Sequence, residues 1–321
     1  MPMTRYAKWL LLAAAASSAH AADTYPVKPI RVVVGFSPGG YVDLGARIVA
    51  GPLSTALGQQ VVVENRAGAG GIVGTEIAAR AAPDGYTLTI GSVGTSTVNQ
   101  SLYKKIPYDT LRDFQAIARL SDAPNVLAVH PSLPVRTVKD VIALTRARPG
   151  QITYATSGAG TSTHLAAALF EMMAQVKMVH IAYKGGAPAV IDVASGQVST
   201  TFATAASVVP HINSGRLRGI AVTGSERSTL IDLPTVAESG LPGYAMINWL
   251  GVFAPIGTPR AITDRLGAEA VRIVRLPDVR EKLNALGAEP APLLGDEFIA
   301  FVKSEIQKWA KVVAASGMTA E

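Results

Sequence analysis

The stretch IRVVVGFSPGGYVD, residues 30–43, decides the fold class. Its β-branched first half predicts a strand over residues 30–35, and from Asp43 an alanine-rich segment with helical spacing runs to residue 57. Pro38, Gly39 and Gly40, which stand between the two, are typical of a tight turn. A strand, a short glycine turn and a helix open a β-α-β unit, so the chain is predicted to be an α/β protein.

The same alternation continues along the chain. We expect strands over residues 61–64 and 87–91 with a helix over 71–82 between them, and then a second set with strands over 126–129, 152–156, 178–181, 198–202 and 217–223 and helices over 137–147, 162–173, 188–195 and 208–213. Residues 224–248 are rich in proline and glycine and predict a surface connection. After it we expect a buried strand over 249–254 and helices over 260–274, 277–286 and 297–315.

Two sets of alternations favour two lobes, each with a mostly parallel sheet. The chain is expected to start in lobe one (22–123), cross to lobe two (124–248) near Pro124 and return near Trp249, so that its last helices cover lobe one (249–321). Two crossings would form a hinge, and a hinged cleft closes on a ligand. Two domains in simple succession are the alternative.

The first residues are predicted to be a signal peptide, residues 1–21. Arg5 and Lys8 precede an apolar run over residues 9–16, and Ala19-His20-Ala21 fits a cleavage site. The run is shorter than the roughly 20 residues of a membrane-spanning helix. We therefore expect export to the periplasm with cleavage near Ala21, and an uncleaved anchor is the alternative.

Cysteine usage and charge exclude several classes of protein. The chain has no cysteine, which rules out disulfides, thiol catalysis, cysteine-ligated zinc and a lipidated cysteine. Its excess of basic over acidic side chains is modest and scattered, without interleaved aromatic residues. Nucleic acid is therefore not expected as a partner, whereas small anions are slightly favoured.

The turn after the first strand is a candidate anion-binding loop. Its glycines let successive amide N–H groups converge, and the following helix adds the positive end of its dipole. The candidate residues are Phe36, Ser37, Gly39, Gly40 and Tyr41. The alternative is a plain turn in which Asp43 only caps the helix.

Residues 157–164, SGAGTSTH, repeat this arrangement in the second lobe. Because ligands of open α/β sheets bind at the carboxyl ends of strands, the two loops are expected to face each other across the cleft. Other strand ends supply further polar side chains, and His164 is expected to form a hydrogen bond near the ligand. The candidates outside the first loop are Ser92, Thr95, Ser157, Gly158, Gly160, Thr161, His164, Tyr183, Thr204 and Ser207.

The sequence does not meet the requirements of three motifs that would indicate a nucleotide cofactor, serine hydrolysis or a bound metal. Residues 68–74 resemble a dinucleotide loop, but Val73 occupies the sixth position of G-x-G-x-x-G. There is no G-x-S-x-G elbow of a serine hydrolase, and His130, His164, His180 and His211 have no metal-ligand spacing. We therefore expect no catalytic residue, cofactor or metal, with an exported hydrolase as the less favoured alternative.

Several blocks in one order resemble a known family. They are YPVKPIR (25–31), the FSPGG-x-x-D loop (36–43), VVVENRAGAGGIVG (61–74), PDGYTL (83–88), HIAYKGGAPA (180–189) and LGVFAPIGTP (250–259). Together they resemble the Bug-type solute receptors, the extracytoplasmic substrate-binding proteins of tripartite tricarboxylate transporters. The resemblance implies a type II periplasmic-binding-protein (Venus-flytrap) fold without catalysis. Such a protein, expected to be a monomer, closes on a small carboxylate and delivers it to membrane permease subunits.

The resemblance also implies where the carboxylate binds. In that family the first loop and facing loops of the second lobe hold it, partly through water and without an obligatory arginine; here this falls on residues 37–41, 157–161, Ser92, Thr95 and His164. The family commonly has a small residue and a threonine where this chain has Tyr41 and Val42. We hypothesise that the ligand has an apolar or aromatic body, as terephthalate does. A periplasmic ligand sensor is an alternative role for the same residues.

Overall fold

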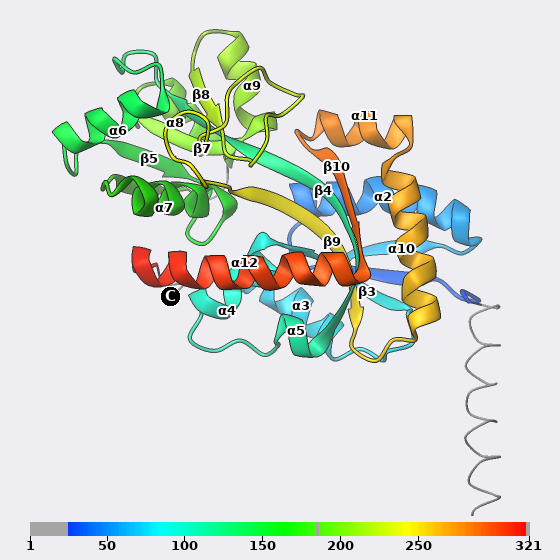
Figure 1. Ribbon diagram of the computed structural model, residues 1–321. Coiled ribbons are helices and arrows are strands. Elements are labelled where there is room, and N and C mark those ends of the chain that lie inside the picture. Colours follow the sequence, from blue (N-terminus) through cyan, green and yellow to red (C-terminus); the bar gives the residue numbers. More distant parts are fainter. Residues whose placement is uncertain (1–24, 184–185, 319–321) are drawn as a thin grey trace, which may run out of the picture.

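Two lobes lie side by side and are joined by two long strands, as Figure 1 shows. The computed structural model describes residues 25–183 and 186–318. The predicted signal peptide and its cleavage site lie outside these residues. The joining strands are β4 (Phe114–Val129) and β9 (Ile247–Pro255), which are paired antiparallel.

The sheet of lobe one has the strand order β2-β1-β3-β9-β4, and β10 also pairs with β4. Its further strands are β1 (Ile30–Val34), β2 (Val61–Asn65), β3 (Thr87–Ser92) and β10 (Glu289–Leu294). Strand β1 is parallel to β2 and β3, whereas β9 is antiparallel to β3 and β10 is antiparallel to β4.

The sheet of lobe two contains β5 (Thr153–Thr156), β6 (Val179–Ala182), β7 (Thr200–Thr204) and β8 (Arg218–Val222). Strand β5 is parallel to β6 and β7, while β4 is antiparallel to β7 and β8. The expectation of mostly parallel sheets was therefore wrong, because both sheets are mixed. Strand β4 carries the chain out of lobe one and β9 carries it back, so these two must run in opposite directions.

Strand β4 is continuous through both lobes. It pairs with β9 from Phe114 to Pro124 and with β7 and β8 from Asn125 onward. We expected the strand to begin only after Pro124, whereas this proline lies within it. Proline has no N–H to donate to a strand ladder, which suits a position where the strand changes partners.

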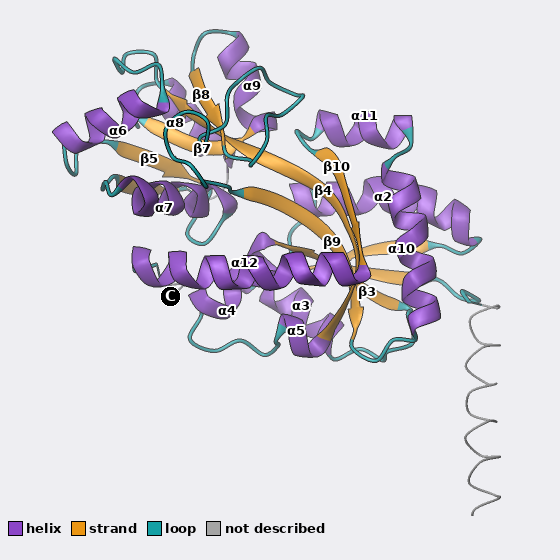
Figure 2. Cartoon of the chain, in the orientation of Figure 1, coloured by secondary structure: helices purple, strands orange, loops and turns teal. Residues whose placement is uncertain are grey.

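Helices flank the strands on both sides (Figure 2). They are α2 (Tyr41–Leu57), η1 (Ala69–Gly71), α3 (Ile72–Ala79), η2 (Gly94–Val98), α4 (Asn99–Leu102), α5 (Thr110–Asp113), α6 (Val138–Ala147), α7 (Ser162–Ala174), α8 (Gly186–Ala194), α9 (Ala205–Asn213), α10 (Arg260–Val274), α11 (Pro277–Ala285) and α12 (Gly295–Ser316). Within residues 25–183 and 186–318, none of the helices has the length and apolarity needed to cross a bilayer.

The last helices differ in what they cover. Helices α10 and α11 pack on lobe one, against α2, β4 and β10. Helix α12 packs on β4 and α4 but also on α7 of lobe two, and in Figure 1 it runs across the front of lobe one and below α7. Its fully buried Trp309 and Phe298 belong to the same apolar core as Trp249 of β9, whose ring centroid lies 5.5 Å from that of Phe298. Helix α12 therefore packs against both lobes and shares one apolar core with them.

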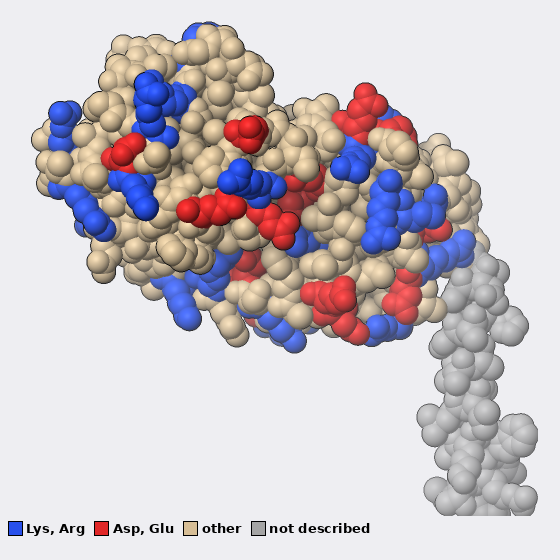
Figure 3. Space-filling view, turned by 45° about the horizontal axis from the view of Figure 1, so that its top comes forward, with Lys and Arg blue, Asp and Glu red and all other residues tan. Residues whose placement is uncertain are grey.

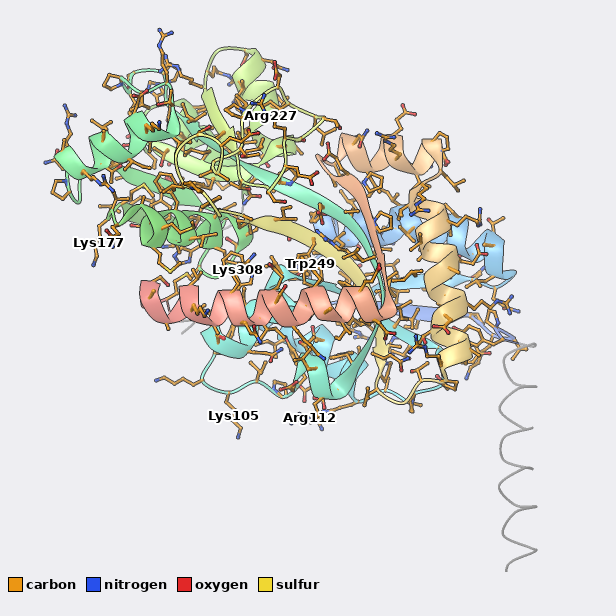
Figure 4. All side chains as sticks on the ribbon, viewed as in Figure 1. Lys105, Arg112, Lys177, Arg227, Trp249 and Lys308 are labelled. Carbon is orange, nitrogen blue, oxygen red and sulfur yellow. The ribbon has the colours of Figure 1, made fainter. Side chains whose placement is uncertain are left out.

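Charged side chains of both signs meet at the waist between the lobes (Figure 3). A cavity of about 370 Å³ there is lined by Arg119 and Asp122 of β4 and by Glu305 and Lys308 of α12. Figure 4 shows Lys308 on α12, with Arg227 on the lobe-two loop above it. Burial raises the pKa of Asp122 to about 6, although Arg119, which forms an ion pair with it, acts in the opposite direction.

Candidate ligand-binding site

A cavity of about 290 Å³ lies between the two lobes. Lobe one contributes the loop after β1, the end of β3 and helix α4, lobe two contributes the loop between β5 and α7, and β9 contributes Asn248. The lining residues are Phe36, Tyr41, Val42, Gly70, Ser92, Val93, Gly94, Asn99, Leu102, Tyr103, Ser157, Ala159, Gly160, Thr161, Ser162 and Asn248. None of these sixteen described residues carries a charge.

Asp43 holds the first loop in shape. Asp43 is 1% exposed, and its carboxylate accepts hydrogen bonds from the Gly39 amide (2.9 Å), the Asn65 side chain (2.8 Å) and Arg47 (3.0 Å). Asn65 also donates to the carbonyl of Phe36 at 3.0 Å. Burial raises the pKa of Asp43, but these donors outweigh it and lower the pKa below its ordinary 3.8. The loop thus folds around a buried carboxylate rather than around a helix cap.

Replacing this carboxylate should destabilise the protein. We expect Asp43→Asn to lower the free energy of unfolding at neutral pH by about 1 to 3 kcal/mol, because hydrogen bonds to a charged group are lost. Since the folded pKa is depressed, the contribution of Asp43 is present above pH 3.8 and is lost as the pH falls through the folded value. Urea unfolding at several pH values should show the two proteins converging in acid. A constant difference at all pH values would contradict this role.

The second loop uses most of its amide groups internally. Ser157 N–H donates to the hydroxyl of Thr163 (2.9 Å), Gly158 N–H to the hydroxyl of Thr156 (3.2 Å), and Gly160 N–H to Nδ1 of His164 (3.1 Å). Gly158 and Gly160 have φ angles of +131° and +72°, in the left-handed half of conformational space that favours glycine. The loop is therefore a rigid turn whose own glycine amides are largely engaged.

The donors that remain are at the starts of two helices. Gly40 and Thr161, the N-cap residues of α2 and α7, form no side-chain cap hydrogen bond. The first helical residues, Tyr41 and Ser162, both line the cavity, and their N–H groups have no partner among the described residues. Unpaired amides and the positive ends of two helix dipoles thus converge on the cavity from opposite lobes.

The structure brings together six of the fifteen candidate residues predicted from the sequence. Phe36, Tyr41, Ser92, Ser157, Gly160 and Thr161 line the cavity. Ser37, Gly39, Gly40, Thr95, Gly158, His164, Tyr183, Thr204 and Ser207 do not line it. Gly39, Gly40, Thr95, Gly158 and His164 support the lining loops instead, and Thr95 accepts a hydrogen bond from the amide of Ser92 (3.1 Å).

Three candidates of lobe two are engaged elsewhere. Tyr183 donates its hydroxyl proton to Asp192 of α8 at 2.6 Å. Thr204 and Ser207, at the start of α9, form a hydrogen bond to each other at 2.8 Å. A strand-end position was therefore not sufficient to place a side chain in this cavity.

The sequence analysis did not predict several of the residues that line the cavity. Asn99 and Leu102 lie in α4 and Tyr103 follows it directly, in a segment for which we predicted no element. Asn248 lies on β9, one residue before the strand we expected. Gly70, which belongs to the loop that resembles a dinucleotide motif, also lines the cavity. The abundance of polar residues over 92–101 was the only available signal.

Comparisons with known proteins identify the family. Residues 45–318 match the family model described as "Tripartite tricarboxylate transporter family receptor". The chain is 40% identical to protein BugT of Bordetella pertussis over 92% of this chain and 91% of that protein.

Solved structures agree with this family. An R. palustris protein solved with adipate is 35% identical, with a TM-score of 0.80 over 92% of this chain and 99% of the other. The periplasmic binding protein BugD is 32% identical, with a TM-score of 0.76 over 92% and 100%. The two-lobed periplasmic-binding-protein fold is thereby confirmed, and the hydrolase alternative falls because these are non-enzymatic binding proteins. The chain belongs to the Bug-type family of periplasmic solute receptors of tripartite tricarboxylate transporters.

Proposed function

We propose that this receptor closes on a small dicarboxylate with an apolar or aromatic body, such as adipate or terephthalate, and delivers it to the membrane subunits of a tripartite tricarboxylate transporter. The observation that carries the proposal is the meeting of two uncapped helix N-termini, from α2 and α7, in an uncharged cavity. Such an end binds anions through its unpaired amides and its dipole. One helix from each lobe supplies a donor group for each end of a dicarboxylate.

The walls of the cavity favour an apolar ligand body. Phe36 of the first loop, Tyr41 and Val42 at the start of α2, and Leu102 of α4 present carbon surface to the cavity. At about 290 Å³ the cavity is at the small end of the range for ligand sites. A compact ligand with polar ends and an apolar middle matches these walls.

The orientation of Tyr41 supports this choice of body. Its hydroxyl lies 3.1 Å from the Ser121 hydroxyl of β4 and 3.5 Å from the carbonyl oxygen of Asn248 of β9. Because the hydroxyl is engaged with both joining strands, the ring rather than the hydroxyl is left to contact a ligand. This is the reverse of what a hydroxyl-rich ligand such as citrate would need.

Isothermal titration calorimetry of the purified protein with adipate, terephthalate and citrate tests the proposal. We expect adipate or terephthalate to bind at least tenfold more tightly than citrate, and Tyr41→Ala to reduce this preference by removing the apolar wall. Tyr41→Phe, which keeps the ring, should retain it. A preference of the unaltered protein for citrate would reject the apolar body, and failure to bind any dicarboxylate would reject the proposal as a whole.

The pairing of the strands supports the lobe limits expected from the sequence, 22–123 with 249–321 and 124–248. Strand β4 changes partners between Pro124 and Asn125, where a bend would rotate one sheet relative to the other. Ligand binding would then stabilise the closed arrangement by contacting both lobes. The family description, a transporter receptor, favours delivery to a transporter over the sensing alternative.

A further inference from the structure

Two buried histidines lie directly beneath the ligand-facing loop of lobe two. His164 of α7 is 8% exposed, and its ring lies 4.1 Å from the ring of His180 of β6, at an angle of 16°. His180 is also nearly parallel to Tyr154 of β5, with 5.0 Å between the ring centroids. Neither histidine lines the cavity, so neither is needed for direct ligand contact.

Each imidazole is connected to one glycine of the loop. Nδ1 of His164 accepts the N–H of Gly160 at 3.1 Å. Nε2 of His180 lies 2.7 Å from the hydroxyl of Thr156, which accepts the N–H of Gly158 at 3.2 Å. Between these two glycines stands Ala159, which lines the cavity. The stacked pair therefore holds the loop at both sides of a ligand-facing residue.

The first of these contacts fixes the chemical state of His164. A backbone N–H can only donate, so Nδ1 must carry a lone pair and the ring must be neutral with its proton on Nε2. A doubly protonated ring has no acceptor, and it would also place a positive charge against its stacked partner.

We propose that His164, stacked on His180, is a positioning residue for ligand binding: as a neutral acceptor it fixes the Gly160 amide and so holds the β5–α7 loop in its binding conformation. The inference rests on the proposed function, because it concerns the same cavity. A loop that is already ordered loses less conformational entropy when a ligand binds, which raises the affinity without an additional ligand contact.

The surroundings keep the imidazole neutral over the usual pH range. Burial, followed by the nearby His180, lowers the pKa of His164 to about 4, and burial also lowers the pKa of His180. Glu171, further along α7, faces Tyr154 and Lys177 and accepts the amide of Met178. Among the described residues, His180 is the one titratable group whose positive charge, when it is protonated, acts on His164. The positioning contact should therefore fail only as the pH approaches about 4.

Two variants separate the acceptor from the ring. His164→Phe keeps an aromatic ring against His180 but has no acceptor, whereas His164→Asn places an amide oxygen close to the position of Nδ1. With adipate as the probe, calorimetry should show a roughly three- to tenfold loss of affinity for His164→Phe, the range expected for one net hydrogen bond. His164→Asn should recover most of it. Unchanged affinity of His164→Phe, or no recovery by His164→Asn, would overturn the proposal.

The pH profile provides a readout that a merely structural role would not change. The affinity of the unaltered protein relative to His164→Asn should fall as the pH is lowered from 7 toward 4, because only histidine loses its acceptor. The asparagine variant corrects for protonation of adipate itself. A constant ratio over this range would contradict the role of the neutral imidazole.

A measurement without ligand keeps this inference separate from the proposed function. In the ¹⁵N-labelled protein, the Gly160 amide resonance should titrate with a midpoint near pH 4, and this titration should be absent in His164→Asn. If adipate does not bind but the resonance behaves in this way, the proposed ligand is wrong and the positioning contact stands. If adipate binds and the resonance does not titrate, the positioning role is wrong.

Discussion

Replacing Ser162 with proline is expected to weaken dicarboxylate binding by roughly 10- to 100-fold. Ser162 is the first residue of α7 and lines the cavity. Proline removes its backbone N–H, and a hydrogen bond from such a group to a charged acceptor contributes about 1.5 to 3 kcal/mol. Each 1.4 kcal/mol corresponds to a factor of ten in the dissociation constant.

The fold should tolerate this change. Proline suits the first position of a helix, where the N–H has no partner within the helix. Thr161, which precedes it, has φ −76° and ψ 164°, the extended conformation that a residue before proline adopts. Ser162→Ala is the matched control, because it removes the hydroxyl and keeps the N–H. Calorimetry should show a much smaller loss for alanine, and equal losses would mean that the hydroxyl rather than the backbone binds the anion.

Trp309→Ala is expected to lower the free energy of unfolding by about 3 to 5 kcal/mol. The side chain is fully buried in the core that α12 shares with both lobes, so its removal leaves a large cavity. It also removes the indole N–H that donates to Glu305 at 2.8 Å. Guanidinium unfolding followed by circular dichroism measures the change.

Trp309→Phe separates the two contributions. It keeps a buried aromatic ring but removes the N–H together with a smaller part of the ring volume than alanine does, so a loss of about 1 to 3 kcal/mol is expected, mainly from the hydrogen bond to a buried carboxylate. Glu305 keeps its ion pair with Lys308 in both variants. A loss below 1 kcal/mol for the alanine variant would show that the end of α12 is not part of the cooperative core.

Most of the longer helices and several short strands of this chain were predictable because each carries its own pattern. Strand β1 and helix α2 are examples, since the strand is β-branched and the helix has apolar residues on one face. The pairing of strands carries no such local signal. Both parallel and antiparallel neighbours bury the same apolar side chains, so the direction of β9 relative to β4 depends on the route of the chain.

Because of their prolines, two features of the sheet could not be predicted from the sequence. Pro124 suggests the end of a segment, but β4 passes through it where its partners change. Strand β10 contains Pro290 and Pro292, which argue against a strand except at the edge of a sheet, and it pairs with β4 on both sides of a register shift. Such edge pairing depends on tertiary contacts, which a local pattern does not reveal.

The two glycine-bearing loops of the candidate site were predictable, whereas the roles of individual side chains were not. Glycine and small polar residues after a strand mark a loop, but only the fold decides which atoms face the cavity. His164 is the clearest case, since its polar ring lies beside the loop and accepts the Gly160 amide instead of facing the cavity. The donors at the starts of α2 and α7 belong to the backbone, which no residue type signals directly.

The proposed binding of the ligand by backbone N–H groups has an evolutionary consequence. Every residue except proline supplies the same amide, so mutations at the starts of α2 and α7 leave the donors in place. Substitutions at Tyr41, Val42 or Leu102 would reshape the carbon surface that surrounds the middle of the guest molecule. After gene duplication, a receptor of this design would need only a few such changes to accept a new nutrient, because the proposed recognition of the acid group is inherited with the fold.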